Sequence, residues 1–392
     1  MAQLLLLRGA KQLLTLRGPN GVRRGASLSD LGIIEDGSVL IQDGRIISVG
    51  PTRRIENLKE TKDAVEIPVN GAVVMPGFAD PAIHVSLWER PSLPGAVARR
   101  KKSLNFYHES LTLVRSCLQH GTLNAEFKVC SDPISYSADV AALRQLLAIG
   151  SNPVAMVRTL RLQSSGVDEA NLVGFAAQLG KLRRGKLAHF IELAVDHAAP
   201  PLNTVLKLLS EAGLPLNLTW AGGSIELLRR LLQLAQPRAV FCSSELQPAE
   251  SALLARSSSI VVFSPCKDLL EERENPSAKK FAAADGAIAL GSGYHSKDAP
   301  IFSMQMVVAL AVLRLRLSVE QAISAATINA AHAMGRGAEV GSIEVGKRAD
   351  LLVLNLSDYR EMPRRIGVNQ VAMALRDGNF VINRKRAKAS AP

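Results

Sequence analysis

Residues 214–263 read LPLNLTWAGGSIELLRRLLQLAQPRAVFCSSELQPAESALLARSSSIVVF, and short apolar runs alternate there with amphipathic runs. Short apolar runs predict buried strands, whereas leucines spaced three and four residues apart predict helices. The predicted strands are 214–218, 239–242 and 260–263, and the predicted helices between them are 225–235 and 248–255. This alternation is typical of a parallel sheet that is covered by helices.

The same alternation continues in both directions along the chain. Further strands are predicted at 74–79, 123–129, 154–158, 189–195 and 287–290. Further helices are predicted at 104–119, 138–149, 170–183, 202–211, 303–315 and 318–334. Eight strands, each followed by a helix, predict an α/β fold with a (β/α)8 barrel of the TIM type. In such barrels the functional side chains lie at the C-terminal ends of the strands.

The two ends of the chain carry similar hairpin signals. Val39–Val49 and Val371–Ile382 are pairs of apolar runs that are joined by Asp43-Gly44 and by Asp377-Gly378. Asp-Gly favours a tight hairpin turn, because that turn needs positive φ. We therefore predict a small composite β-sandwich domain that is formed by both termini, from residues 1–75 plus 341–392. The barrel is predicted over residues 76–340.

Composition and charge exclude several classes of protein. No stretch of the 392 residues approaches eighteen apolar residues, so a membrane span is not expected. The formal charge of +12 is spread over short clusters without a nucleic-acid motif. This pattern favours solvated helix ends and a basic tail over a nucleic-acid partner. Four cysteines without CxxC pairing indicate a reducing, cytoplasmic setting.

Several segments resemble one known family. Val74–Asp80 is similar to the start of the first barrel strand in the amidohydrolase superfamily, and Gly341–Leu351 is similar to its return into the sandwich. Segments that resemble imidazolonepropionase more specifically are Ala326–Gly335, Asp358–Glu361, Gly367–Val371 and His120–Thr122 with Glu126 and Lys128. The resemblance is strong over residues 1–85 and 285–382. It implies the amidohydrolase fold, hydrolysis of non-peptide carbon–nitrogen bonds, and one bound zinc or iron ion.

The resemblance also implies where that metal would be held. The family pattern is His-x-His on strand 1, His on strand 5 and Asp on strand 8. In this sequence Ala82, Thr219 and Gly293 stand at three of these positions, and His84 is the only surviving family ligand. Alanine and glycine cannot coordinate a metal, and a neutral threonine is a poor zinc ligand. The resemblance therefore implies a degenerate metal site that has also lost its general base.

Other polar residues could form a different site. His84, Glu245 and His295 could supply a rearranged metal site, or they could line an old pocket. Glu126 and Lys128 alternate with Ala125 and Phe127 on one predicted strand, so both are expected to share the face that points into the barrel. They could act as an acid–base pair or form a structural ion pair.

An arginine and two cysteines near the strand ends are weaker candidates for functional residues. The family binds its substrate carboxylate with an arginine near the position of Arg90, which could instead lie on a loop surface. Cys130 and Cys266 each follow a predicted strand, and a nucleophilic cysteine needs a neighbouring histidine or a positive environment. Buried, inert thiols are the more common case.

Three functions are compatible with the sequence. The first is a pseudoenzyme that keeps a pocket and binds a small molecule or a partner subunit. The second is an active metal-dependent C–N hydrolase with a rearranged site at His84, Glu245 and His295. The third is a structural subunit of an active homologue. Members of the family commonly form homodimers, so pairing with a second copy or with a homologue is expected.

Overall fold

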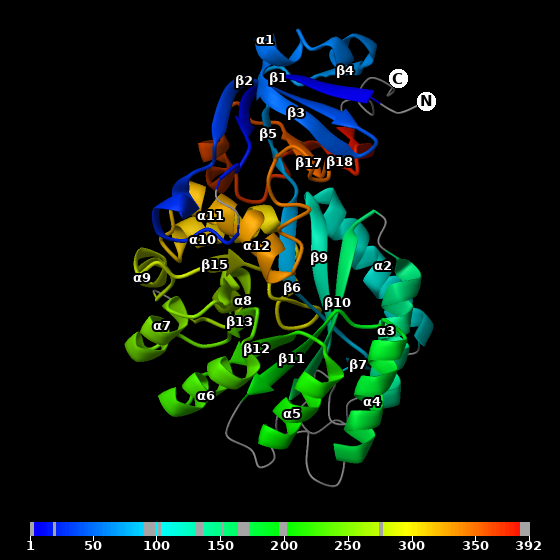
Figure 1. Cartoon of the computed structure of the whole chain (residues 1–392), viewed down its shortest axis with the longest axis vertical. Helices are drawn as coiled ribbons and strands as arrows, with labels where there is room; N and C mark the ends of the chain where they lie inside the picture. Colours follow the sequence, from blue (N-terminus) through cyan, green and yellow to red (C-terminus); the bar gives the residue numbers. More distant parts are fainter. Residues whose placement is uncertain are drawn as a thin grey trace.

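The computed structural model describes residues 4–18, 21–89, 99–100, 103–130, 136–150, 153–163, 172–195, 202–273 and 277–384. Two sheets organise these residues (Figure 1). One is the barrel sheet, and the other is a mixed sheet that is built from both ends of the chain.

Parallel strands form the barrel sheet, in the order β15-β14-β13-β12-β11-β10-β9-β6-β16. Their bounds are β6 Phe78–Ser86, β9 Thr122–Cys130, β10 Ala155–Gln163, β11 Phe190–Val195, β12 Leu216–Trp220, β13 Ala239–Cys242, β14 Ile260–Phe263, β15 Ile288–Leu290 and β16 Tyr294–His295. Strand β15 pairs with β14, and β16, which follows it directly, pairs with β6. One passage of the chain therefore closes the ring, and the predicted barrel is confirmed.

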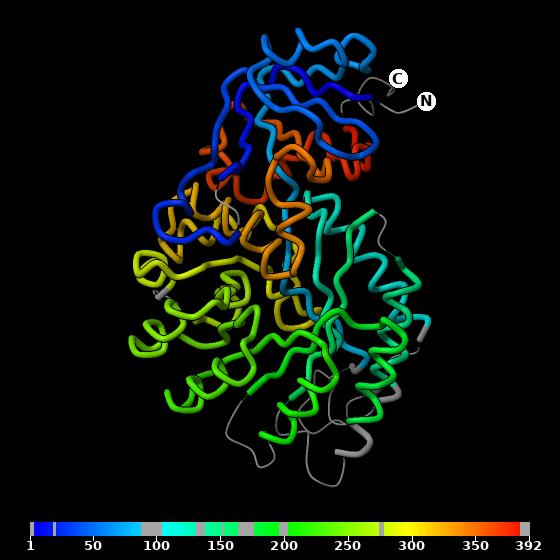
Figure 2. The backbone as a smooth tube through the Cα atoms, in the orientation of Figure 1, coloured from blue at the N-terminus to red at the C-terminus, as the bar shows by residue number. Residues whose placement is uncertain are grey.

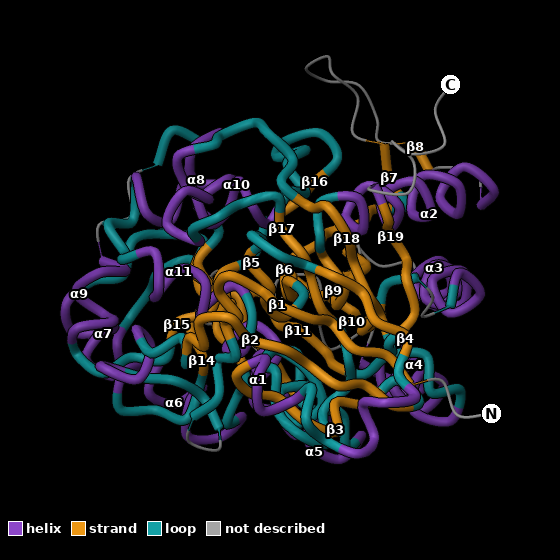
Figure 3. Tube along the Cα trace, turned by 90° about the horizontal axis from the view of Figure 1, so that it is seen from above, coloured by secondary structure: helices purple, strands orange, loops and turns teal. Residues whose placement is uncertain are grey.

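Helices surround the barrel strands when the molecule is seen from above (Figure 3). They are α2 Ser103–Gln119, α3 Tyr136–Ile149, α4 Leu172–Arg184, α5 Leu202–Ala212, α6 Ile225–Ala235, α7 Pro248–Ala255, α8 Pro265–Leu270, α9 Ser277–Ala283, α10 Met304–Leu313, α11 Val319–Ala326 and α12 Ile328–Ala333. Helices α6 and α7 begin and end at the predicted residues. In α6, the buried Leu228 and Leu231 face the core, and the Ser224 hydroxyl accepts a hydrogen bond from the Leu227 N–H at the N-terminus.

Two predicted elements are each divided into two in the structure, and most of the others differ from their predicted bounds by a few residues. The strand predicted at 74–79 is two strands, because β5 (Val73–Pro76) belongs to the mixed sheet and the first barrel strand begins at Phe78. The helix predicted at 318–334 is interrupted at Thr327, which has φ −125° and ψ −91°. The Thr327 hydroxyl donates a hydrogen bond to the Ile323 carbonyl at 2.7 Å. At the break, the side chain therefore competes with backbone N–H groups for a carbonyl acceptor of the helix.

The mixed sheet joins both ends of the chain, which Figure 2 shows as blue and red tube lying together. Its order is β19-β18-β17-β5-β1-β2-β3, and β4 pairs with β1. The bounds are β1 Leu4–Leu14, β2 Ile33–Gln42, β3 Arg45–Pro51, β4 Val65–Pro68, β17 Leu351–Leu354, β18 Val371–Arg376 and β19 Asn379–Asn383. Both predicted Asp-Gly hairpins are confirmed. The domain boundaries near residues 75 and 341 stay predictions.

Within the described ranges, no helix combines the length and the apolar character that crossing a membrane requires.

Candidate functional site

Lys128 lies at the centre of the barrel with a fully buried side chain. It extends from β9, and its ammonium forms an ion pair with Glu192 of β11. The Lys128 Nζ atom is also 3.7 Å from Glu126 Oε1 and 2.9 Å from the centroid of the Phe241 ring. Two carboxylates and an aromatic face thus surround one cation, an arrangement that offsets the cost of burying it.

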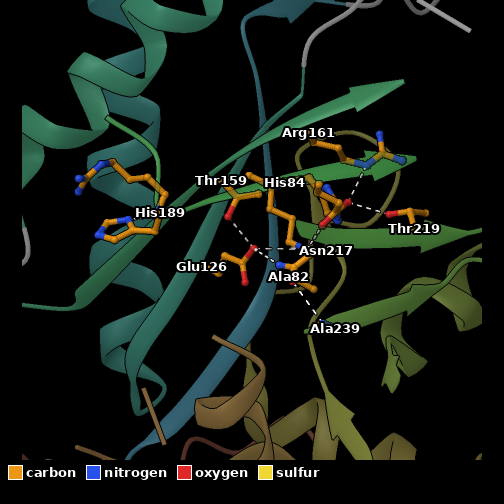
Figure 4. A network of polar contacts seen from close by, with 12 residues as sticks. Ala82, His84, Glu126, Thr159, Arg161, His189, Asn217, Thr219 and Ala239 are labelled. Atoms are coloured by element: carbon orange, nitrogen blue, oxygen red, sulfur yellow. Dashed lines mark hydrogen bonds and ion pairs between the residues drawn. The ribbon is translucent and has the colours of Figure 1, made fainter. Parts of the chain in front are cut away.

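Glu126 lies two residues before Lys128 on β9, so both side chains are on the same face of the strand. Its Oε1 accepts hydrogen bonds from Thr159 Oγ1 at 2.7 Å and from Asn217 Nδ2 at 3.5 Å, and Figure 4 shows both side chains directed at this carboxyl. Glu126 Oε2 is buried and has no hydrogen-bond partner among the described residues. Burial raises the pKa of Glu126 to about 7, although Lys128 opposes the change.

Glu192 joins the centre of the barrel to its mouth. Its Oε1 accepts from Arg161 Nε at 3.0 Å and from Thr219 Oγ1 at 2.7 Å (Figure 4). Burial acts to raise the pKa of Glu192, but the charges of Lys128 and Arg161 together hold it below its ordinary value. Glu192 is therefore a carboxylate at neutral pH, and the Thr219 hydroxyl serves as its hydrogen-bond donor.

His84 and Cys130 meet at the barrel mouth on the adjacent strands β6 and β9. The distance from His84 Nδ1 to Cys130 Sγ is 3.5 Å. Burial, followed by the positive charges of Lys128 and Arg161, holds the pKa of His84 well below its ordinary value. Burial also raises the pKa of the Cys130 thiol, and Arg161 partly offsets that effect. A neutral thiol therefore faces a neutral imidazole.

Ala82 and Gly293 lie where the chain closes the barrel. The buried Asp80 Oδ1 accepts from the Ala82 and Ser292 N–H groups, each at 3.0 Å, which ties β6 to the segment between β15 and β16. Gly293 has φ +65°, in the left-handed region. A Cβ atom at Gly293 would lie 2.8 Å from the Cβ atoms of Ser264 and Lys267. Both the positive φ and the close neighbours favour glycine at this position.

Comparison with known proteins finds relatives of similar sequence. The pattern of the Amidohydrolase family matches residues 233–381. The imidazolonepropionase of Chloroflexus aggregans is 27% identical, and the match covers 96% of this chain and 98% of that protein. The imidazolonepropionase of Geobacillus kaustophilus is also 27% identical, with 97% and 98% covered.

The chain is similar to the Amidohydrolase family over residues 233–381. It resembles imidazolonepropionase over nearly its whole length. Solved structures of the same fold include an E. coli guanine deaminase, with a TM-score of 0.70 and 17% identity over 97% of this chain and 99% of that one. A triazine hydrolase variant has a TM-score of 0.76 and 14% identity, over 98% and 95%. At these identities the likeness concerns the fold alone.

The residues that the structure describes do not assemble the rearranged metal site. Glu245 is exposed after β13, and His295, which lies opposite His84 in the β16–β6 register, has its Nδ1 atom 2.9 Å from Asp298 Oδ2. Among the residues that the structure describes, no three His, Cys, Asp or Glu side chains are grouped so that they could hold a metal ion. Arg90 lies outside the described residues.

Sequence reasoning identified part of this site and missed the rest. Glu126 and Lys128 were expected to share one face, and both lie inside the barrel. Arg161 and Glu192 were missed, although Glu192 is the one charged residue in the apolar strand Phe190–Val195. A lone charge within a buried strand was the available signal, because such a charge requires a partner. Cys266 is buried within α8, as expected of an inert thiol.

Glu126 predicts a pH dependence of stability with a definite sign. The pKa of Glu126 is about 7 in the folded chain, against an ordinary value of 4.5, so the folded chain holds this proton more tightly. Its contribution to stability is therefore present at low pH and is lost as pH rises from about 4.5 to about 7. We expect the wild type to lose more free energy of unfolding between about pH 5 and about pH 8 than Glu126→Gln does. Urea denaturation at both pH values measures this, and equal losses would contradict it.

Proposed function

We propose that this chain does not hydrolyse carbon–nitrogen bonds through a bound zinc or iron ion, although it keeps the amidohydrolase frame. In this proposal the centre of the barrel is a structural ion-pair cluster. The function of the chain is then to bind a small molecule or a homologous subunit. With respect to the metal-dependent reaction it is a pseudoenzyme.

The Lys128 ammonium is the observation that carries this proposal. It is fully buried between Glu192 and Glu126 and lies against the Phe241 ring. A fixed positive charge at this position repels a metal cation, because Coulomb repulsion is strong where water is excluded. The carboxylates that could attract a metal are already paired with the protein's own cation.

The donor atoms at the positions implied by the family resemblance support the same conclusion. Ala82 and Gly293 have no donor atom in their side chains. The Thr219 hydroxyl donates its proton to Glu192 and is therefore oriented as a donor toward the carboxylate. His84 contributes one imidazole, whereas a catalytic zinc ordinarily takes three protein ligands. These residues do not fit the metal.

The test is metal content together with turnover. Purified protein is incubated with zinc, iron or manganese, dialysed and analysed by plasma mass spectrometry, and is then assayed for ring opening of imidazolone propionate. The Geobacillus kaustophilus imidazolonepropionase, taken through the same steps, is the positive control. We expect substoichiometric metal and no turnover from this chain.

One result would overturn the proposal. Stoichiometric metal that supports turnover, and that is lost in His84→Ala while the fold is retained, would establish a working metal site. In that case Lys128 would have to leave its present position. A crystal structure of the metal-loaded protein would then show a broken ion pair between Lys128 and Glu192.

A further inference from the structure

A cavity of about 290 Å³ lies where the barrel meets the mixed sheet, away from the barrel mouth. His120, just before β9, and Asn369, just before β18, are among the residues that line it. Strand β9 begins at this end of the barrel and ends at the mouth, so the cavity is separate from the positions of the family metal. Its volume is at the lower end of the range for small-molecule sites, roughly 300–1,000 Å³.

Two side-chain amides fix the wall of this cavity. Gln305 Nε2 of α10 donates to the His120 carbonyl at 3.0 Å and to Asn369 Oδ1 at 3.1 Å. Gln305 Oε1 accepts from the Gln370 N–H at 3.0 Å. Asn369 Nδ2 donates to the Gln119 carbonyl at 2.7 Å. These bonds join α10, the turn before β9 and the start of β18, so the cavity is already formed and a ligand can bind with little reordering of the protein.

Much of the remaining lining is apolar. Its apolar side chains include Ile301, Phe302, Met306, Ile366 and Val368. Ile366 is 48% exposed and Val368 is 58% exposed, although both are large apolar residues. The His120 and Phe302 rings meet edge to face, with their centroids 5.2 Å apart. Apolar and aromatic side chains that are exposed around a cavity favour a ligand with an apolar ring, because the ring removes their surface from water.

Two polar groups of the lining have unused hydrogen-bonding capacity. Arg365 forms an ion pair with Glu361 through Nη2, and its Nε and Nη1 atoms have no hydrogen-bond partner among the described residues. Ser303 precedes α10, but its hydroxyl does not cap that helix. A guanidinium with donors to spare binds carboxylates through charge-assisted hydrogen bonds. The charge of the lining therefore favours an acidic ligand.

We propose that this cavity binds a small aromatic carboxylate. Its ring lies against the apolar lining around Phe302 and Val368, and its carboxylate accepts hydrogen bonds from the Arg365 guanidinium. No covalent bond forms or breaks. This proposal rests on the binding role proposed above, and it gives that role a site and a class of ligand.

The experiment uses phenylacetate as the probe and 2-phenylethanol, which carries a hydroxyl in place of the carboxylate, as the uncharged comparison. Isothermal titration calorimetry with the full chain measures the Kd of each. We expect phenylacetate to bind roughly tenfold or more tightly than 2-phenylethanol, as a hydrogen bond between charged groups allows. Arg365→Met should abolish this preference. Glu361→Gln should strengthen phenylacetate binding, because Arg365 then loses its competing carboxylate.

A charge placed beside the cavity tests its location. Val368→Glu should weaken phenylacetate binding roughly tenfold or more, because like charges repel. Val345→Glu is the matched control, since Val345 is 65% exposed and is not part of the cavity lining. Arg360→Met is the control for Arg365→Met, because Arg360 pairs with Asp358 and is likewise not part of the lining. Both controls should bind phenylacetate as the wild type does, and circular dichroism establishes that each variant is folded.

Three results would overturn the proposal. They are the absence of saturable phenylacetate binding, equal binding of the two probes, and undiminished phenylacetate binding by a folded Val368→Glu variant. Light scattering identifies the competing occupant, because a chain that binds neither probe and forms a dimer that Val368→Glu dissociates has a second copy on this face. The outcome is separable from the metal test. Turnover with bound metal would overturn the proposed function, whereas failure to bind phenylacetate would leave that test unchanged.

Discussion

Replacing Lys128 with methionine is expected to lower the free energy of unfolding by about 3–5 kcal/mol, the usual cost of removing one partner from a buried ion pair. The substitution keeps most of the volume of the side chain, so the loss arises mainly from charge. It leaves Glu192 buried with Arg161 and Thr219 as its remaining partners, and it leaves Glu126 without a cation. Urea denaturation followed by circular dichroism measures the change.

Lys207→Met is the control for this variant. The Lys207 Nζ atom lies 3.9 Å from Glu211 Oε1, and the lysine side chain is 77% exposed. Such a surface pair contributes little, so we expect a change within about 0.5 kcal/mol.

Adding Glu192→Gln to Lys128→Met should recover part of the lost stability, because the buried charge is removed with its partner. If the two substitutions were simply additive, Lys128 and Glu192 would not be coupled. The ion-pair cluster would then not account for the stability of the barrel centre.

Returning the aspartate that the family resemblance implies, by Gly293→Asp, is expected to destabilise the fold by about 2–4 kcal/mol. Two effects add here. A non-glycine residue at φ +65° is strained by about 1 kcal/mol or more, and overpacking of a buried site costs about 1–3 kcal/mol. The crowding is specific, because the new Cβ atom would lie 2.8 Å from the side chains of Ser264 and Lys267.

Gly346→Asp separates these two effects. Gly346 has φ +89°, and no atom lies within 4 Å of the position that its Cβ would occupy. This variant should lose only the cost of the backbone conformation, about 1 kcal/mol. A Gly293→Asp variant no less stable than Gly346→Asp would show that this segment can readily accept the aspartate, and would weaken the proposal that the metal site has been replaced.

The barrel and both hairpins could be predicted from the sequence because their signals are local. The apolar runs at 239–242 and 260–263 became β13 and β14 with unchanged bounds. The first barrel strand was misplaced because residues 73–79 form one continuous run without a charged or polar side chain, which spans the end of β5 and the start of β6. Only their pairing with different sheets separates them, and pairing is not a local property.

The sequence by itself determined which side chains are present. Ala82 and Gly293 have no side-chain atom that could bind a metal, and Glu126 and Lys128, two residues apart on a strand, share one face of it. The tertiary structure decided what these residues do. Glu192 lies 64 residues from Lys128 along the chain, and Cys130 lies 46 residues from His84. Closure of the barrel and the register of its parallel strands bring such residues together, and a buried charge or thiol takes its character from the neighbours that this register supplies.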